Sequence, residues 1–140
     1  MKKILLPVDG SVGSDRAVEY VISLAREGVE LDVHLMNVPI SLESAHFRSF
    51  IAHDMIDDSR CQEADKAFES AAALLDHARV KYRRVVMVGD AAEAIASQAA
   101  DGFDAIVMAT RGMGAVGDFV LGSTAARVVH LADIPVTLIK

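Results

Sequence analysis

Two short segments contain the residues best suited to bind a ligand. Residues 111–124, RGMGAVGDFVLGST, hold four glycines, and a helix that begins near Ser123 would point free N–H groups at an anion. Residues 7–11, PVDGS, include Asp9, whose carboxylate can accept hydrogen bonds from hydroxyl or amino groups. The first segment predicts a phosphate site. Two plainer interpretations stay open: the glycines only shape a surface loop, and Asp9 only caps a helix or a turn.

Two known phosphate-binding patterns fit the glycine-rich segment only in part. Residues 112–117 match G-x-G-x-x-G, but that dinucleotide fingerprint opens a helix and is followed about 20 residues later by an acid that ends a second strand. The apolar run that follows here, 136–139, has no acid at its tip. Residues 117–124 resemble a phosphate loop with Ser123 where the lysine belongs, so phosphoryl transfer would lack a main source of charge stabilisation. We expect neither a nicotinamide or flavin site nor a rapid phosphotransferase.

Apolar runs alternate with helical patterns, and these elements must position the two segments. We expect strands over residues 3–8, 31–38, 84–88, 103–108 and 136–139. We expect helices where apolar residues recur at helical spacing, within 18–25, 64–78, 92–99 and 125–132. Parallel strands need crossover connections, and these are right-handed. The pattern predicts a single α/β domain with a doubly wound, Rossmann-like, five-stranded parallel sheet and helices on both faces.

In such sheets a ligand binds beyond the carboxyl ends of the strands, where the strand order reverses. Residues 7–11 and 109–112 each follow a strand, so both face one crevice if the first and fourth strands are neighbours. Asp90 is expected to cap the third helix, with Glu93 reaching back to it. Residues 39–60 are long for a connection in a compact domain, and we interpret them as a mobile flap that can contain a short helix.

The composition argues against several functions. The net charge of −6 disfavours nucleic acid or an anionic membrane as the main partner, because both are bound through clustered Lys and Arg. The pair Arg83 and Arg84 is too small to reverse this. The apolar run near Met1 is too short for a signal peptide or a membrane span, so we expect a cytoplasmic protein. Cys61 is the only cysteine and the five histidines lack a zinc-binding spacing, so we expect no disulfide and no protein metal site.

The chain resembles the universal stress proteins essentially from end to end, from ILLPVDGS near its start to VVHLADIPVTL near its end. Nucleotide-binding members of that family carry G-x-x-G, nine residues, and then G-S/T. Gly112, the nine residues after it, Gly122 and Ser123 match this motif, whereas Ala109 replaces its first glycine. Ala109 adds a methyl group at a position where the motif passes a ribose or a phosphate, and two outcomes stay open: the methyl group crowds the ligand, or it is harmless. The resemblance implies that residues 1–140 form one universal stress protein domain with the fold of the adenine nucleotide alpha hydrolases.

The resemblance also implies a site for an adenine nucleotide. Asp9 and Val38 would hold the adenosine part, with Pro7 beside it. The motif positions Ala109, Gly112, Gly122, Ser123 and Thr124 would surround the phosphates, with Arg111 leaning on them. The implied ligand is ATP, with Mg²⁺ bound through its phosphates.

Three functions stay open. The first, which the resemblance supports, is a dimeric ATP-binding regulatory module of the stress response, whose nucleotide orders the flap at 39–60 or alters a partner surface. The second is a nucleotide-free interaction protein, which the alanine at position 109 favours. The third is a slow ATPase, although the sequence offers no committed general base and no assignable catalytic residue.

The C-terminal strand predicts a homodimer. Residues 136–139 are apolar and uncharged, and we expect them at an edge of the sheet, with Pro135 and Lys140 only at the strand ends. Pairing of this strand with its copy across a two-fold axis would satisfy its backbone groups without growth into a fibre. The resemblance implies the same interface, which would contain Val136 and Leu138. The alternative is a monomer in which another segment covers the edge.

Overall fold

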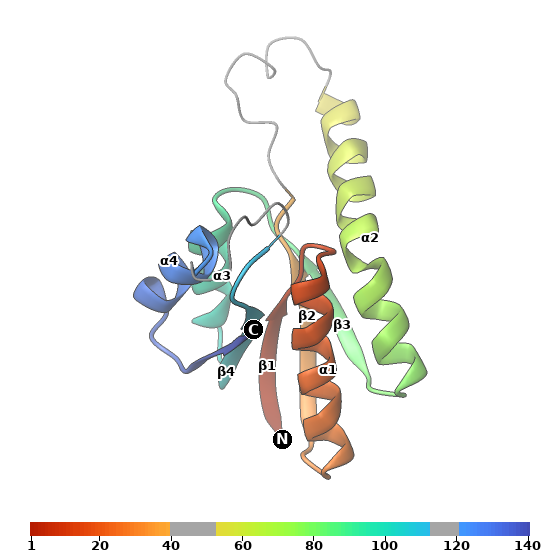
Figure 1. The fold of residues 1–140 in the computed structure, drawn as a ribbon. Helices are drawn as coiled ribbons and strands as arrows, with labels where there is room; N and C mark the ends of the chain where they lie inside the picture. Colours follow the sequence, from red (N-terminus) through yellow and green to blue (C-terminus); the bar gives the residue numbers. More distant parts are fainter. Residues whose placement is uncertain (40–52, 113–120) are drawn as a thin grey trace.

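The computed structural model describes residues 1–39, 53–112 and 121–140. Strands and helices alternate through these ranges (Figure 1). The strands are β1 (Lys2–Pro7), β2 (Leu31–Asn37), β3 (Tyr82–Val86), β4 (Ala105–Ala109) and β5 (Val136–Ile139). The helices are α1 (Val12–Arg26), α2 (His53–His77), α3 (Ala91–Ala99) and α4 (Ser123–Leu131). Among the described residues, none of the helices is long and apolar enough to cross a membrane.

The strands form one parallel sheet in the order β3-β2-β1-β4-β5. In the register, Ile4 of β1 lies opposite Val33 of β2 on one side and Ala105 of β4 on the other. The predicted doubly wound parallel sheet is therefore confirmed, and the first and fourth strands are neighbours, which is the condition for residues 7–11 and 109–112 to lie together. The strand order reverses between β1 and β4, which places the crevice of the fold at the carboxyl ends of these two strands.

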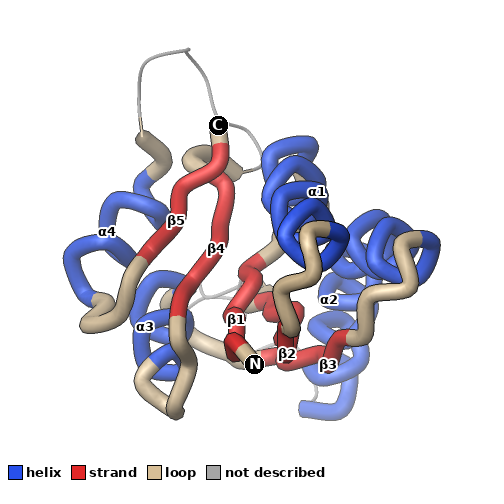
Figure 2. Tube along the Cα trace, turned by 90° about the horizontal axis from the view of Figure 1, so that it is seen from below, coloured by secondary structure: helices blue, strands red, loops and turns tan. Residues whose placement is uncertain are grey.

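Helices cover both faces of the sheet, as predicted. α1 and α2 pack on one face, and α3 and α4 pack on the other (Figure 2). The central strand β1 serves both cores, because successive side chains of a strand point to opposite faces: Leu6 joins the α1/α2 core and Leu5 joins the α3/α4 core. Both leucines are fully buried, and burial of each stabilises the fold by about 1.5–3 kcal/mol.

The third helix is capped as the sequence indicates, with one difference. The Asp90 carboxylate accepts a hydrogen bond from the Glu93 N–H at 3.0 Å. The Glu93 side chain, which we expected to reach back toward the cap, instead lies 3.8 Å from the Arg127 guanidinium of α4. The N-terminus of α3 is thus linked to the neighbouring helix.

The sequence interpretation differs most from the structure in the segment before α2. That helix begins at His53, so residues 53–60 are the start of a 25-residue helix rather than a separate short helix of the predicted flap. Residues 53–63 contain no glycine or proline but place polar residues all around the helix, so no apolar stripe marks its start. The rest of the predicted flap, residues 40–52, lies outside the described residues.

Three smaller expectations also shift. β3 and β4 are each displaced from the predicted strands by one to two residues, because apolar runs define a strand better than its ends. Val129, which falls in the predicted apolar stripe of α4, is 47% exposed, whereas Val128 beside it is fully buried. The buried side of α4 is therefore narrower than its sequence indicates.

Candidate functional site

Asp9 follows β1, and its carboxylate organises the turn that leads into α1. Its Oδ1 accepts hydrogen bonds from the Ser11 N–H at 2.9 Å and from the Ser14 hydroxyl at 2.8 Å. Gly10 allows the turn through a φ of +83°, and a Cβ there would lie 3.4 Å from the backbone of Ala67 in α2. One carboxylate oxygen of Asp9 therefore stabilises the turn, as the plainer interpretation of this residue has it.

The second oxygen of Asp9 lies next to the loop that follows β4. A Cβ on Gly112 would overlap with Asp9 Oδ2, so the two strand-end loops can approach this closely only because residue 112 is glycine. The structure thus brings together two residues that are 103 positions apart in the sequence and that were both assigned to the site. The contact lies at the strand-order reversal, where this fold binds ligands.

Gly122 attaches the start of α4 to the end of β4. Its N–H donates to the Thr110 carbonyl at 2.7 Å, and a Cβ on Gly122 would lie 2.9 Å from that same oxygen. Gly122 is also the N-cap residue of α4, and it supplies no side-chain hydrogen bond to the first turn. Ser11 and Asp90 do supply such a bond to α1 and α3. Because a glycine cap has no side-chain acceptor, the backbone N–H groups in the first turn of α4 are suited to bind an anion.

An ion pair holds α4 against α3 close to this turn. Arg127 Nη1 lies 2.6 Å from Asp90 Oδ2. The Arg127 hydrogen bond, together with the bond from the Glu93 N–H, lowers the pKa of Asp90, and the same pair raises the pKa of Arg127. Arg127 is one turn beyond Ser123, so this pair orients the end of α4 that faces the β4 loop.

All nine candidate residues lie at the carboxyl end of the sheet. Pro7 and Ala109 are the last residues of β1 and β4, while Val38 directly follows β2 and packs on the α3/α4 core. Beyond these strand ends lie Asp9, Arg111 and Gly112, and then Gly122 with Ser123 and Thr124 at the start of α4. The centre of the glycine-rich segment, residues 113–120, lies outside the described residues.

The Ala109 methyl group points toward α1. A Cβ on Gly13 of that helix would lie 3.0 Å from the Ala109 Cβ and 2.8 Å from the Arg111 carbonyl oxygen. Ala109 itself is only 9% exposed. The methyl group therefore fills space that Gly13 leaves between α1 and β4, and this packing favours the alternative in which it is harmless to a ligand.

Ala109→Gly is accordingly expected to affect stability more than binding. Loss of a buried methyl group and a gain of backbone freedom in a strand should lower the free energy of unfolding by about 1–2 kcal/mol. The dissociation constant for ATP should stay within about twofold, because the methyl group faces Gly13. Urea unfolding and calorimetric titration measure the two effects. An increase in affinity of tenfold or more would show that the methyl group does crowd the nucleotide.

The sequence analysis missed Asn37, the last residue of β2. Its side chain is buried, and its amide donates to the Val8 carbonyl at 2.8 Å. Its backbone carbonyl accepts from the Met87 N–H at 3.1 Å, whereas its side-chain Oδ1 is buried without a hydrogen-bond partner among the described residues. The Asn37 side chain therefore joins the end of β2 to Val8, the residue before Asp9, and Asn37 directly precedes Val38. The signal was an amide directly after the apolar pair Leu35 and Met36 at the end of the strand LDVHLMN, where a buried polar group needs a specific partner.

We expect Asn37→Ala to reduce both stability and nucleotide affinity. It leaves the Val8 carbonyl without its donor, which should cost about 1–3 kcal/mol of unfolding free energy. The affinity for ATP should fall several-fold, because Asp9 and Val38 lose their common support. Leu75→Ala is the control: it removes a fully buried side chain near the other end of the sheet, and it should lower stability by about 2–5 kcal/mol without a change in affinity. If Asn37→Ala and Leu75→Ala bind ATP with the same affinity, Asn37 does not support the nucleotide site.

The fold is a doubly wound α/β domain with the candidate site at the strand-order reversal between β1 and β4. Comparison with known proteins identifies its family. The model of the universal stress protein family matches residues 1–140. A universal stress protein encoded in the QAH/OAS sulfhydrylase 3′ region of Thermus aquaticus is 38% identical over 99% of this chain and 98% of its own length. Universal stress protein MJ0531 of Methanocaldococcus jannaschii is 28% identical over 99% of this chain and 82% of its own. The chain belongs to the universal stress protein family.

Solved structures agree with this assignment. The protein MJ0577 superposes with a TM-score of 0.83 at 26% identity, over 99% of this chain and 95% of its own. More distant structures include an Arabidopsis thaliana family member with AMP bound, with a TM-score of 0.69 at 18% identity over 100% of this chain and 92% of its own. An Archaeoglobus fulgidus universal stress protein in complex with dAMP has a TM-score of 0.65 at 20% identity, over 100% and 98%. At these identities the two structures establish the shared fold alone.

Proposed function

We propose that this chain binds ATP at the carboxyl ends of β1, β2 and β4 and acts as a dimeric regulatory module of the stress response. The observation that supports the site most strongly is the approach of Gly112 to Asp9 Oδ2, which leaves no room for a side chain on residue 112. This approach joins the carboxylate proposed to hold the adenosine part to the loop proposed to hold the phosphates. Two proteins of the same fold were solved with AMP or dAMP, which favours an adenine nucleotide as the ligand.

Each part of ATP has a suitable partner in this proposal. The Asp9 carboxylate accepts hydrogen bonds from ribose hydroxyls. The phosphates lie at the glycine-capped N-terminus of α4, with Ser123 and Thr124 in its first turn and Arg111 opposite. Val38 lies against the adenine from the end of β2. Mg²⁺ is a hard cation that keeps oxygen ligands and water, and it is proposed to bind through the phosphate oxygens.

The alternative is a universal stress protein that works without nucleotide, through protein contacts alone. Replacement of the first motif glycine by Ala109 favours it, but the Ala109 methyl group packs on Gly13 and so gives this alternative little support.

Mass analysis of the nucleotide released by denaturing the freshly purified protein distinguishes the two functions. ATP at about one equivalent per chain supports the proposal. A protein that releases no nucleotide and gives no heat on titration with ATP up to about 1 mM contradicts it, since such an affinity would be weaker than about −4 kcal/mol.

A further inference from the structure

The outer edge of β3 is open to a partner in the part of the chain that the structure describes. β3 ends the sheet on the side opposite β5 and pairs only with β2. The Met87 N–H donates to Asn37 of β2. Because alternate residues of a parallel strand direct their backbone groups to opposite sides, the N–H and C=O groups of Arg84 and Val86 point away from β2. These groups are a template for another strand.

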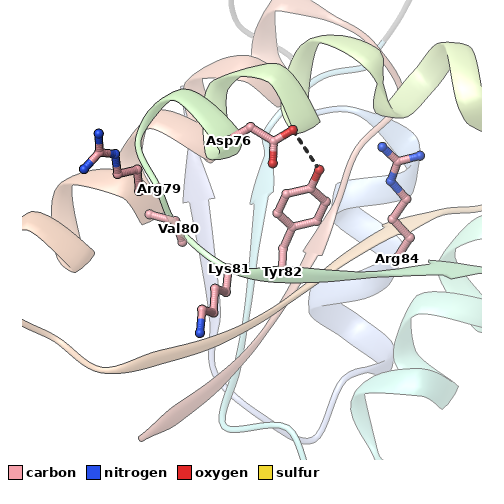
Figure 3. A pocket seen from close by; sticks show the side chains of 6 residues that line it. All are labelled: Asp76, Arg79, Val80, Lys81, Tyr82 and Arg84. Atoms are coloured by element: carbon pink, nitrogen blue, oxygen red, sulfur yellow. Dashed lines mark hydrogen bonds between the residues drawn. The ribbon is translucent and has the colours of Figure 1, made fainter.

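A groove runs beside this edge, between β3 and α2. One hollow of about 600 Å³ lies between the end of α2 and the start of β3 (Figure 3). A second hollow of about 550 Å³ continues along α2, and Asp76 and Arg84 line both. Asp76 accepts a hydrogen bond from the Tyr82 hydroxyl at 3.4 Å (Figure 3), while Arg79 and Lys81 extend away from this pair. The second hollow is also lined by Asp65, Lys66 and Glu69, so the cations gather at the end of the groove beside the start of β3, where Arg79, Lys81 and Arg84 line the first hollow.

The outer edge of β3 is positively charged, whereas the chain as a whole is negatively charged. Residues 79–84, RVKYRR, contain four cations and no acid, in a chain whose net charge is −6. Arg83 is 74% exposed at its side chain although its Nε lies 3.9 Å from Asp32 Oδ1 of β2, and the Arg84 guanidinium is placed 5.5 Å above the Phe68 ring. A second copy of the chain would bring like charges together at this edge, which is unfavourable. A strand that carries carboxylates complements it.

We propose that the β3 edge binds an extended acidic segment of another protein, which adds as a further strand beside β3. Backbone hydrogen bonds to Arg84 and Val86 supply the pairing, and carboxylates of the segment contact Lys81, Arg83 and Arg84. Val86 and Val88 are 47% and 50% exposed, and they supply apolar contacts next to the cations. The surface is separate from the proposed nucleotide site, because the outward backbone groups of β3 face away from β2, whose carboxyl end belongs to that site.

The test uses a fluorescein-labelled, eight-residue peptide of alternating glutamate and threonine and measures its anisotropy. We expect saturable binding that weakens as the salt concentration rises. Lys81→Glu combined with Arg84→Glu should weaken binding at least tenfold. The control is Arg16→Glu combined with Arg26→Glu, which makes the same change of net charge at exposed positions of α1 and should leave binding unchanged.

Backbone pairing is tested separately from charge. Val86→Pro keeps every cation but removes an outward N–H, and edge strands tolerate proline at such positions, so binding should fall at least tenfold. A peptide N-methylated at alternate residues tests the same hydrogen bonds on the unchanged protein, and it should bind at least tenfold more weakly. Binding that survives both changes overturns the added strand. Absence of peptide binding, or a dimer that Lys81→Glu with Arg84→Glu dissociates, overturns the acidic partner.

Discussion

Asp9→Asn should weaken ATP binding by roughly ten- to hundredfold and leave the domain folded. The substitution keeps an oxygen that can accept from the Ser11 N–H and the Ser14 hydroxyl, so the turn into α1 is preserved. It replaces the negative oxygen beside Gly112 with an amide. The loss of a charge-assisted hydrogen bond to ribose should cost about 1.5–3 kcal/mol of binding free energy. Calorimetric titration measures the affinity, and urea unfolding measures the stability.

The matched control separates ligand binding from support of the turn. Ser14→Ala removes the hydroxyl that bonds to Asp9 and should lower stability by about 1 kcal/mol, but it leaves the carboxylate in place and should change the affinity little. Gly122→Val should also reduce the affinity at least tenfold, because its side chain meets the Thr110 carbonyl and displaces the start of α4. Wild-type affinity in both Asp9→Asn and Gly122→Val would reject the site.

The protein is expected to be a homodimer that pairs through β5, and scattering should give a mass near twice the 15.0 kDa of one chain. β5 lies at the sheet edge opposite β3, its four residues are half-buried, and none is charged. Val129 and Leu131 of α4, which precedes β5, are 47% and 41% exposed, which adds apolar surface near this edge. An open apolar edge favours association, and antiparallel self-pairing closes it.

Val136→Lys combined with Leu138→Lys should give a monomer. Both side chains also pack on the α3/α4 core, so the pair lowers the stability of the chain itself. Thr137→Lys is the milder test, because it places one charge near its own copy at the middle of the paired strands, where like charges repel. It should weaken the dimer at least tenfold while the unfolding midpoint of the monomer stays close to wild type. A wild-type mass near 15 kDa at micromolar concentration contradicts the dimer, and a dimer that Thr137→Lys leaves intact places the interface elsewhere.

The fold was predictable because most of it follows from local patterns. The apolar run at β1 indicates a strand buried on both faces, and Asp90 three residues before Glu93 marks the start of α3. The start of α2 was not predictable, because residues 53–63 lack an apolar stripe. The exposure of Val129 depends on where the sheet ends, and the spacing of apolar residues within one helix carries no information about that position.

The candidate site was predictable in its residue types but not in its distances. Glycine at position 112 suggested a close approach, and only the pairing of β1 with β4 shows that the approach is to Asp9. The direction of the Ala109 methyl group depends on which face of β4 carries α1, so the motif alone could not decide between crowding of a ligand and harmless packing. Asn37 acts through a carbonyl of another strand, and a single sequence does not reveal such a partner.

The most direct test of the proposed site is a titration of the ¹⁵N-labelled protein with ATP, followed by amide chemical shifts. We predict that saturable shifts concentrate on Asp9, Val38, Gly112 and the N–H groups of Ser123 and Thr124. The edge strand β3 should remain unaffected, since β2 lies between it and the crevice. Absence of shifts at about 1 mM ATP, or shifts confined to residues away from the ends of β1 and β4, would contradict the account.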